Sequence, residues 1–226
     1  MSNVLSVPDR IYVYEIPVRL WHWINAAAIV VLALTGWLIA HPPVAAGGEA
    51  SEHFLMGYIR FGHFSAGYIL AVGLIGRAYW ALVGNRYARE LFLPAVHDPH
   101  WWQGLWHELL WYLFLVAEPR KHAGHNPLAG LTLFLCYVLG SLFMMVSGFA
   151  LYGEGAGGWS AALFGWVLPL LGGSQQAHSL HHLGMWYLVV FSLVHVYVAI
   201  REQHLSRQSV ASTMVDGWRV WKDDRP

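Results

Sequence analysis

Five histidines lie within or at the ends of long apolar segments of this 226-residue sequence: His22, His63, His181, His182 and His195. Burying a ligand-capable side chain in lipid without a partner is costly, so each of the five is a candidate functional residue. Neutral imidazole is a common metal ligand and also serves as an axial ligand of haem iron. The other histidines fall in more polar stretches, where an ordinary solvated side chain is the simpler interpretation: His41, His53, His97, His100, His107, His122, His125, His178 and His204.

The spacing of the histidines near the carboxyl end favours two separate sites. His181 and His195 are 14 residues apart, which on a helix returns to within about 40° of the same face after a rise of roughly 21 Å. One helix can therefore offer one ligand to each of two haems. His182 points about 140° away from His195, so we interpret it as a neighbour of the site or a propionate contact.

Depth in the membrane predicts how the four remaining histidines pair. His22 and His195 both lie about one turn inside the predicted cytoplasmic boundary, and His63 and His181 both lie at the periplasmic boundary. Two bis-histidine pairs result, which fill both axial positions of each iron and leave electron transfer as the available chemistry. The single cysteine, Cys136, lies in an apolar run outside any C-x-x-C-H motif, so the haems are predicted to be two non-covalent b haems.

Four apolar windows are long enough to carry these residues across a bilayer. The chain is 57% hydrophobic and only 12% charged, and a helix needs about 20 apolar residues to span the hydrocarbon. The predicted fold is all-α: one integral membrane domain over residues 1–226, folded as a four-helix bundle, with its first window retained as a signal-anchor. The windows run approximately over 20–40, 62–83, 128–151 and 182–200.

The distribution of Lys and Arg predicts the orientation. With both termini cytoplasmic, Arg60 is the sole basic residue outside, which satisfies the positive-inside rule. Residues 101–116 are predicted to form an interfacial cytoplasmic helix, and residues 159–171 an apolar periplasmic segment suited to a protein partner. The formal net charge is zero, which gives no basic footprint for nucleic acid. The basic residues predicted inside are Arg10, Arg19, Arg77, Arg86, Arg89, Arg120, Lys121, Arg201, Arg207, Arg219, Lys222 and Arg225.

Two glycines and two arginines near the predicted ligands are further candidates for haem binding. Gly67 and Gly184 each follow a ligand by about one turn, where a missing side chain would admit a flat macrocycle, although close helix packing explains either equally well. Arg60 and Arg19 each lie three residues before a ligand and could pair with a propionate. A plain interfacial anchor is the alternative for both arginines.

A quinone site is predicted at the start of the third window, in the segment GHNPLA. His125 and Asn126 could hydrogen-bond a quinone carbonyl or relay protons. The alternative for Asn126 is to cap the helix that begins at Pro127.

The sequence resembles the b-type cytochrome subunit of membrane-bound nickel-iron uptake hydrogenases, within the wider bacterial cytochrome b561-like group. Two segments carry the resemblance, RLWHWINAAAIVVLALTG from Arg19 to Gly36 and HSLHHLGMWYLVVFSLVH from His178 to His195. It extends through YEIPVRLWHW, FLMGYIRFGHF, GHNPLA, YGEGA and RQSVASTMV, and so covers nearly the whole chain.

The resemblance implies a subunit of the bacterial inner membrane that anchors a periplasmic hydrogenase, whose small and large subunits carry the hydrogen chemistry. It would pass electrons through two haems, held by His22, His63, His181 and His195, to the quinone pool as part of a hydrogen:quinone oxidoreductase, with no catalytic residue of its own. One alternative is the cytochrome b subunit of another respiratory complex, such as formate dehydrogenase or thiosulfate reductase, or a stand-alone b561-like quinone reductase. A second is a small transporter that uses intramembrane histidines for metal ions or protons.

Overall fold

The computed structural model describes residues 10–43, 54–118 and 120–221. This part of the chain is mostly helical, with two short strands near its ends. His53, Lys222, Arg225 and both chain termini, which bear on the predicted orientation, lie outside the described residues. The elements in chain order are β1 (Arg10–Tyr12), α1 (Ile16–Ala40), α2 (Leu55–Val83), α3 (Arg86–Arg89), α4 (Pro99–Tyr112), α5 (Pro127–Thr132), the π-helix η2 (Leu133–Val138), α6 (Leu139–Ala156), α7 (Gly158–Phe164), α8 (Val167–Leu170), α9 (Ser174–Leu205), α10 (Thr213–Asp216) and β2 (Trp218–Val220).

The four predicted spans are confirmed as helical segments long and apolar enough to cross a membrane, and each is longer than its apolar window. They cover Ile16–Ala40, Leu55–Val83, Pro127–Ala156 and Ser174–Leu205. The predicted windows are shorter because each helix continues beyond its apolar stretch into polar and aromatic residues. The SQQAHS start of α9 is an example. The third span contains the π-helical stretch η2, in which backbone hydrogen bonds join residues five apart instead of four.

Contacts divide the chain into two compact units, which we describe separately. The strand unit comprises residues 1–22, 77–134 and 193–226, and the cavity unit comprises residues 23–76 and 135–192. Each of the four long helical segments contributes one part to each unit. Since His22 and His195 fall in the strand unit and His63 and His181 in the cavity unit, the two predicted ligand pairs lie in different units.

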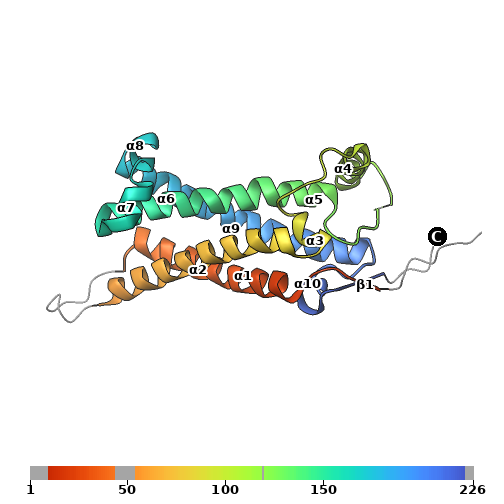
Figure 1. Cartoon of the computed structure of the whole chain (residues 1–226), viewed down its shortest axis with the longest axis horizontal. Helices are drawn as coiled ribbons and strands as arrows, with labels where there is room; N and C mark the ends of the chain where they lie inside the picture. The colour runs from red at the N-terminus through yellow and green to blue at the C-terminus, as the bar shows by residue number, and fades with distance from the viewer. Residues whose placement is uncertain (1–9, 44–53, 119, 222–226) are drawn as a thin grey trace, which may run out of the picture. The chain divides into compact units, whose positions relative to one another are not determined.

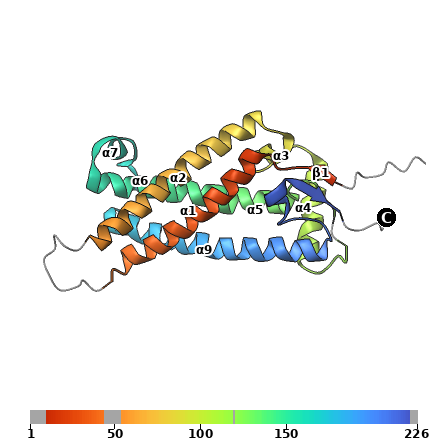
Figure 2. The same ribbon diagram turned by 90° about the horizontal axis from the view of Figure 1, so that it is seen from below.

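A two-stranded antiparallel sheet joins the two ends of the described chain in the strand unit (Figure 2). Ile11 of β1 pairs with Arg219 of β2. Gly217 connects α10 to β2 with φ +87°, a conformation that favours glycine. Its carbonyl accepts hydrogen bonds from the backbone N–H groups of Val13 at 2.8 Å and Tyr14 at 3.2 Å. The tail is thereby fixed to the segment that enters α1.

The core of the strand unit forms where that segment meets α3. Five residues are buried there together: Val13, Tyr14, Val18, Tyr87 and Ala88. Asn85 caps α3, because its side-chain oxygen accepts from the Ala88 N–H at 3.0 Å, while its amide group donates to the Val13 carbonyl at 2.9 Å.

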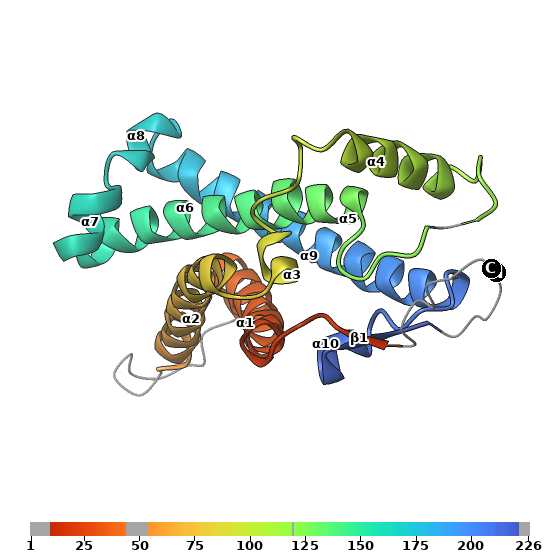
Figure 3. The same ribbon diagram turned by 45° about the vertical axis from the view of Figure 1, so that its right-hand side comes forward.

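The predicted helix within residues 101–116 appears as α4, which packs beside α5 in the strand unit (Figure 3). Asp98 caps it by accepting from the His100 N–H at 2.9 Å, and Pro99 occupies the first helical position. Glu108, on the buried face of α4, is fully enclosed and accepts a hydrogen bond from Asn126 at 3.4 Å.

In the cavity unit, the segment predicted over residues 159–171 folds as α7 and α8, which lie against α6 (Figure 1). The helix break falls at Gly165 and Trp166, ahead of Pro169. Pro169 lies in the first turn of α8, where a backbone N–H has no intrahelical partner, so the missing N–H of proline costs no helical hydrogen bond. Trp159, Leu163 and Leu170 remain exposed on these two helices.

Candidate functional site

His63 of α2 and His181 of α9 face each other in the cavity unit. Their ring centres are 6.4 Å apart, with ring planes inclined at 71°. A metal–imidazole bond is about 2 Å long and the ring nitrogen lies about 1.2 Å from the ring centre, so two imidazoles on opposite sides of one metal have centres roughly 6.4 Å apart. The separation of these two rings therefore fits two axial ligands of one iron.

A hydroxyl group from a neighbouring helix contacts each of these rings. The Thr35 Oγ1 of α1 lies 2.9 Å from the Nδ1 of His63, and the Ser147 Oγ of α6 lies 2.8 Å from the Nδ1 of His181. Sequence reasoning missed both residues. The signal that could have found them is the dipeptide hydroxyl–glycine, which occurs in apolar helical surroundings as Thr35–Gly36 and Ser147–Gly148.

A cavity of about 670 Å³ opens beside His63 and His181. Its walls come from α1, α2, α6 and α9 and are mainly aliphatic, aromatic and methionine side chains, within the size range of cofactor sites. Arg60 and His182 also line it. An apolar cavity lined by two facing imidazoles, with a few polar groups at its wall, fits a haem with propionate side chains.

The two predicted glycines occupy different positions. Gly67 lines the cavity, and a Cβ added there would meet nothing within 4 Å. Gly184 is absent from the cavity lining within the described residues, and a Cβ there would collide with the sulfur of Met144 on α6. Gly184 is thus placed for close packing of α9 on α6, the alternative stated for it above.

His22 of α1 and His195 of α9 form the corresponding pair in the strand unit. Their ring centres are also 6.4 Å apart, with planes inclined at 51°. Both pairs therefore have the ring separation expected of two imidazoles bound to opposite sides of one metal. Both pairs that spacing and depth predicted have neighbouring rings in the structure, and each pair lies within one unit.

Arginines near His22 have buried N–H groups that could receive an anion. Arg19 donates from Nη1 to the Val215 carbonyl, and its Nε is buried without a hydrogen-bond partner among the described residues. Arg77 is only 3% exposed. Its Nη2 donates to the Ala88 carbonyl at 2.7 Å, whereas its Nε and Nη1 have no hydrogen-bond partner in the described part of the chain. In the sequence, Arg77 was counted only for its charge.

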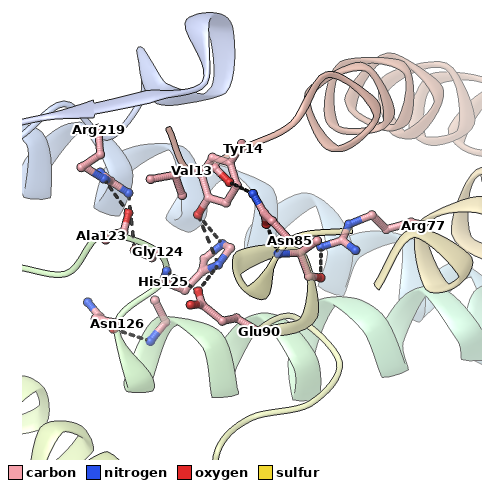
Figure 4. A network of polar contacts seen from close by, with 12 residues as sticks. Val13, Tyr14, Arg77, Asn85, Glu90, Ala123, Gly124, His125, Asn126 and Arg219 are labelled. Atoms are coloured by element: carbon pink, nitrogen blue, oxygen red, sulfur yellow. Dashed lines mark hydrogen bonds and ion pairs between the residues drawn. The ribbon is translucent and has the colours of Figure 1, made fainter. Parts of the chain in front are cut away.

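His125 lies in a network of polar contacts in the strand unit (Figure 4). The Tyr14 hydroxyl lies 3.3 Å from either ring nitrogen of His125, and the Glu90 carboxylate accepts from the His125 backbone N–H at 2.9 Å. Burial raises the pKa of Tyr14, Glu90 raises it further, and Arg219 opposes the shift. The phenol is therefore neutral at ordinary pH and is available to donate a hydrogen bond.

Asn126 caps α5, as the alternative interpretation expected. Its side-chain oxygen accepts from the Ala129 N–H at 2.6 Å, and its amide group donates to Glu108. Glu108 also contacts His122, whose Nε2 lies 3.0 Å from the carboxylate. Both quinone candidates thus belong to buried polar networks that sequence reasoning had not foreseen, because Tyr14, Glu90 and Glu108 are remote from them in the chain.

Facing imidazole pairs inside long apolar helices define the chain as a helical membrane cytochrome. Its residues 13–217 match the family described as prokaryotic cytochrome b561, and the chain belongs to this family. The family implies a b-type haem. With four spanning segments, the chain is a multi-pass protein of the bacterial inner membrane.

Relatives from several bacteria are similar over nearly their full length. A probable Ni/Fe-hydrogenase B-type cytochrome subunit of Azotobacter vinelandii is 61% identical over 96% of this chain and 91% of its own. A protein of the same description from Cupriavidus necator is 58% identical over 94% of this chain and 88% of its own. The probable Ni/Fe-hydrogenase 1 B-type cytochrome subunit of Escherichia coli K12 is 47% identical over 93% of this chain and 91% of its own.

Proposed function

We propose that this protein is the membrane anchor and electron-transfer subunit of a nickel-iron hydrogenase, carrying electrons through two b haems to the quinone pool. The observation that carries the two-haem proposal is the equal 6.4 Å separation of the ring centres in the two histidine pairs. The names of the relatives from Azotobacter vinelandii and Escherichia coli support the hydrogenase partner. The small and large hydrogenase subunits would bind on the periplasmic side and perform the hydrogen chemistry.

His63 and His181 would hold one haem, and His22 and His195 the other. A b haem with two imidazole ligands supplies reversible one-electron transfer and offers no open coordination position for oxygen. Around the first pair, the apolar wall of the cavity excludes water, and Gly67 leaves room for the macrocycle.

Arginines would bind the negatively charged propionates. Arg60 lines the cavity of the first pair. Arg19 and Arg77 have buried N–H groups in the unit that contains the second pair. A charged donor paired with a carboxylate forms a strong hydrogen bond, which would compensate for burying the guanidinium group.

The polar network around His125 is the candidate quinone site. His125 and Asn126 would bind a quinone carbonyl or relay protons. The neutral phenol of Tyr14 contacts the imidazole of His125, and the carboxylate of Glu90 accepts from the His125 backbone N–H. Reduction of a quinone takes two electrons and two protons, so ionisable groups close to the site are needed.

The topology that accompanies this function has both termini in the cytoplasm and α4 lying on the cytoplasmic membrane surface. We treat residues 1–226 as one functional domain, because four continuous helical segments contribute to both units. The Lys and Arg distribution supports the orientation. Accessibility of single cysteines to a membrane-impermeant label would test it.

The decisive experiment is haem quantitation on the purified full-length chain and its ligand variants. The wild type should contain two haems per chain, and His63→Ala and His22→Ala should each contain one. His100→Ala, which alters an exposed histidine at the start of α4, is the matched control and should retain both. A His63→Ala variant with two low-spin haems would refute the pairing.

Purification in mild detergent should also recover the nickel-iron subunits, and their consistent absence would refute the proposed partner.

A further inference from the structure

The dipeptide hydroxyl–glycine makes equivalent contacts with both histidines of the cavity unit. Thr35–Gly36 on α1 contacts His63, and Ser147–Gly148 on α6 contacts His181. In each case the hydroxyl approaches the Nδ1 of the ring and the glycine approaches the neighbouring Cε1. Two different helices thus present the same local arrangement to the two rings that face each other.

The hydroxyl hydrogens determine the direction of these hydrogen bonds. Thr35 Oγ1 donates to the Val31 carbonyl at 2.6 Å, and Ser147 Oγ donates to the Phe143 carbonyl at 2.7 Å. A hydroxyl has a single hydrogen. A carbonyl oxygen can only accept, so the contact with the preceding turn uses that hydrogen. In the arrangement that satisfies both contacts, each hydroxyl oxygen accepts from the imidazole and the Nδ1 carries the proton. The Nε2 of each ring is then unprotonated and free to bind a metal.

The glycines restrict the orientation of the same rings. A Cβ on Gly36 would lie 3.3 Å from the Cε1 of His63, and a Cβ on Gly148 would lie 3.1 Å from the Cε1 of His181. Both distances are tighter than ordinary van der Waals contact. The ring edge therefore packs directly on the helix backbone, which keeps the Nδ1 within reach of the hydroxyl.

We propose that Thr35–Gly36 and Ser147–Gly148 are positioning residues that fix the tautomer and orientation of His63 and His181 and set the potential of the haem they hold. The inference rests on the proposed ligand role of these histidines. A ligating histidine whose other N–H is donated to an acceptor becomes a stronger base. Stronger donation to the iron favours its ferric state, so the two hydroxyls lower the midpoint potential of this haem relative to the same site without them.

The test compares Thr35→Val, which keeps the shape but removes the acceptor, with Thr35→Ser, which keeps the acceptor. In a redox titration of the full-length chain, we expect Thr35→Val to raise the potential of one haem and leave the other unchanged. A tenfold change in the ferric preference corresponds to about 59 mV for one electron. Thr35→Ser should titrate like the wild type. Selective loss of that haem from Thr35→Val, with retention in Thr35→Ser, would support the inference equally.

Ser147→Ala provides an independent test on the opposite ligand. Its matched control is Ser192→Ala, because Ser192 Oγ makes the same kind of bond to the preceding turn, to the Leu188 carbonyl at 2.8 Å, in the same unit. We expect Ser147→Ala to raise the same haem potential as Thr35→Val, and Ser192→Ala to leave it unchanged. The double variant should raise the potential further than either change alone, because each change removes an acceptor from a different ligand.

The outcomes separate this inference from the proposed function. If no haem depends on His63 and His181 in the wild-type background, the proposed ligand set fails. If a haem depends on both but Thr35→Val behaves like Thr35→Ser, or Ser147→Ala behaves like Ser192→Ala, the positioning role is overturned while the ligand assignment stands.

Discussion

The guanidinium group of Arg77 lies over the indole ring of Trp21, with 5.6 Å between its central carbon and the ring centre. The same carbon lies 5.4 Å from the ring centre of Phe92. This arrangement holds a buried cation beside the residue that precedes the proposed ligand His22, while its Nε and Nη1 have no hydrogen-bond partner in the part of the chain that the structure describes. A stacked guanidinium is also a planar donor, which lysine cannot replace.

Replacing Arg77 should therefore change one haem selectively. We expect Arg77→Gln to lower the midpoint potential of the haem bound by His22 and His195, because a nearby positive charge disfavours the ferric state. A tenfold change in the equilibrium between ferric and ferrous haem corresponds to a shift of about 59 mV in the midpoint potential. Redox titration of the variant measures it. Arg89→Gln, at an exposed arginine of α3, should leave both potentials unchanged. Equal shifts in the two variants would argue against a propionate contact at Arg77.

Filling the cavity should displace the haem bound by His63 and His181. Gly67 has open space where its side chain would be, so Gly67→Leu should fold but lose that haem. Gly67→Ala adds one carbon and should retain it. The haem-to-protein ratio of the purified variants provides the measurement. Gly76→Ala, on the same helix and with equally open space, is a control for helix propensity. Full haem content in Gly67→Leu would exclude haem from the vicinity of Gly67.

Quinone reduction should depend on His125 separately from helix capping. Asn126→Ala removes the cap of α5, at a cost of about 1 kcal/mol, whereas Asn126→Ser can keep it. We expect Asn126→Ala to slow quinone reduction and both variants to retain intact haem spectra. His125→Gln should slow it as well, without changing α5. Measuring quinol formation with reduced protein checks each variant. Normal turnover in both Asn126→Ala and His125→Gln would discard the proposed quinone site.

Alkaline pH should destabilise the strand unit through Tyr14. The pKa of its buried phenol is raised in the folded protein, so above the ordinary value of about 10 the unfolded state loses its proton first. Stability should therefore fall as the pH rises above that value. In Tyr14→Phe this part of the pH dependence should disappear. Thermal unfolding in detergent between about pH 9 and 11 measures the difference. The same slope in both proteins would contradict the assignment to Tyr14.

The sequence was sufficient to predict the long helices and to select the histidines that lie in pairs, because both predictions use patterns along single segments. A run of apolar residues predicts a span, and fourteen residues on α9 separate His181 from His195 regardless of tertiary contacts. The helix ends were less predictable, because the SQQAHS segment of α9 is polar and yet helical. An apolar pattern cannot predict that a helix continues through polar residues of this kind.

The remaining site residues could not be predicted because they depend on contacts between helices. Thr35 and Ser147 look like ordinary small residues of an apolar helix until His63 and His181 are placed beside them. Arg77 contributed only its charge to the sequence analysis, and only the structure shows that it is buried and that its Nε and Nη1 have no hydrogen-bond partner among the described residues. Gly184 satisfied the spacing expected of a haem contact, but in the structure it lies against Met144.

The way the units divide the chain has a consequence for biosynthesis. Every segment of the cavity unit has been translated once the ribosome passes Ser192, whereas the strand unit needs Trp218–Val220 to pair with Arg10–Tyr12. Contacts that join distant ends of a chain form late. We therefore expect the pocket around His63 and His181 to mature first during membrane insertion, once residues up to 192 have left the ribosome.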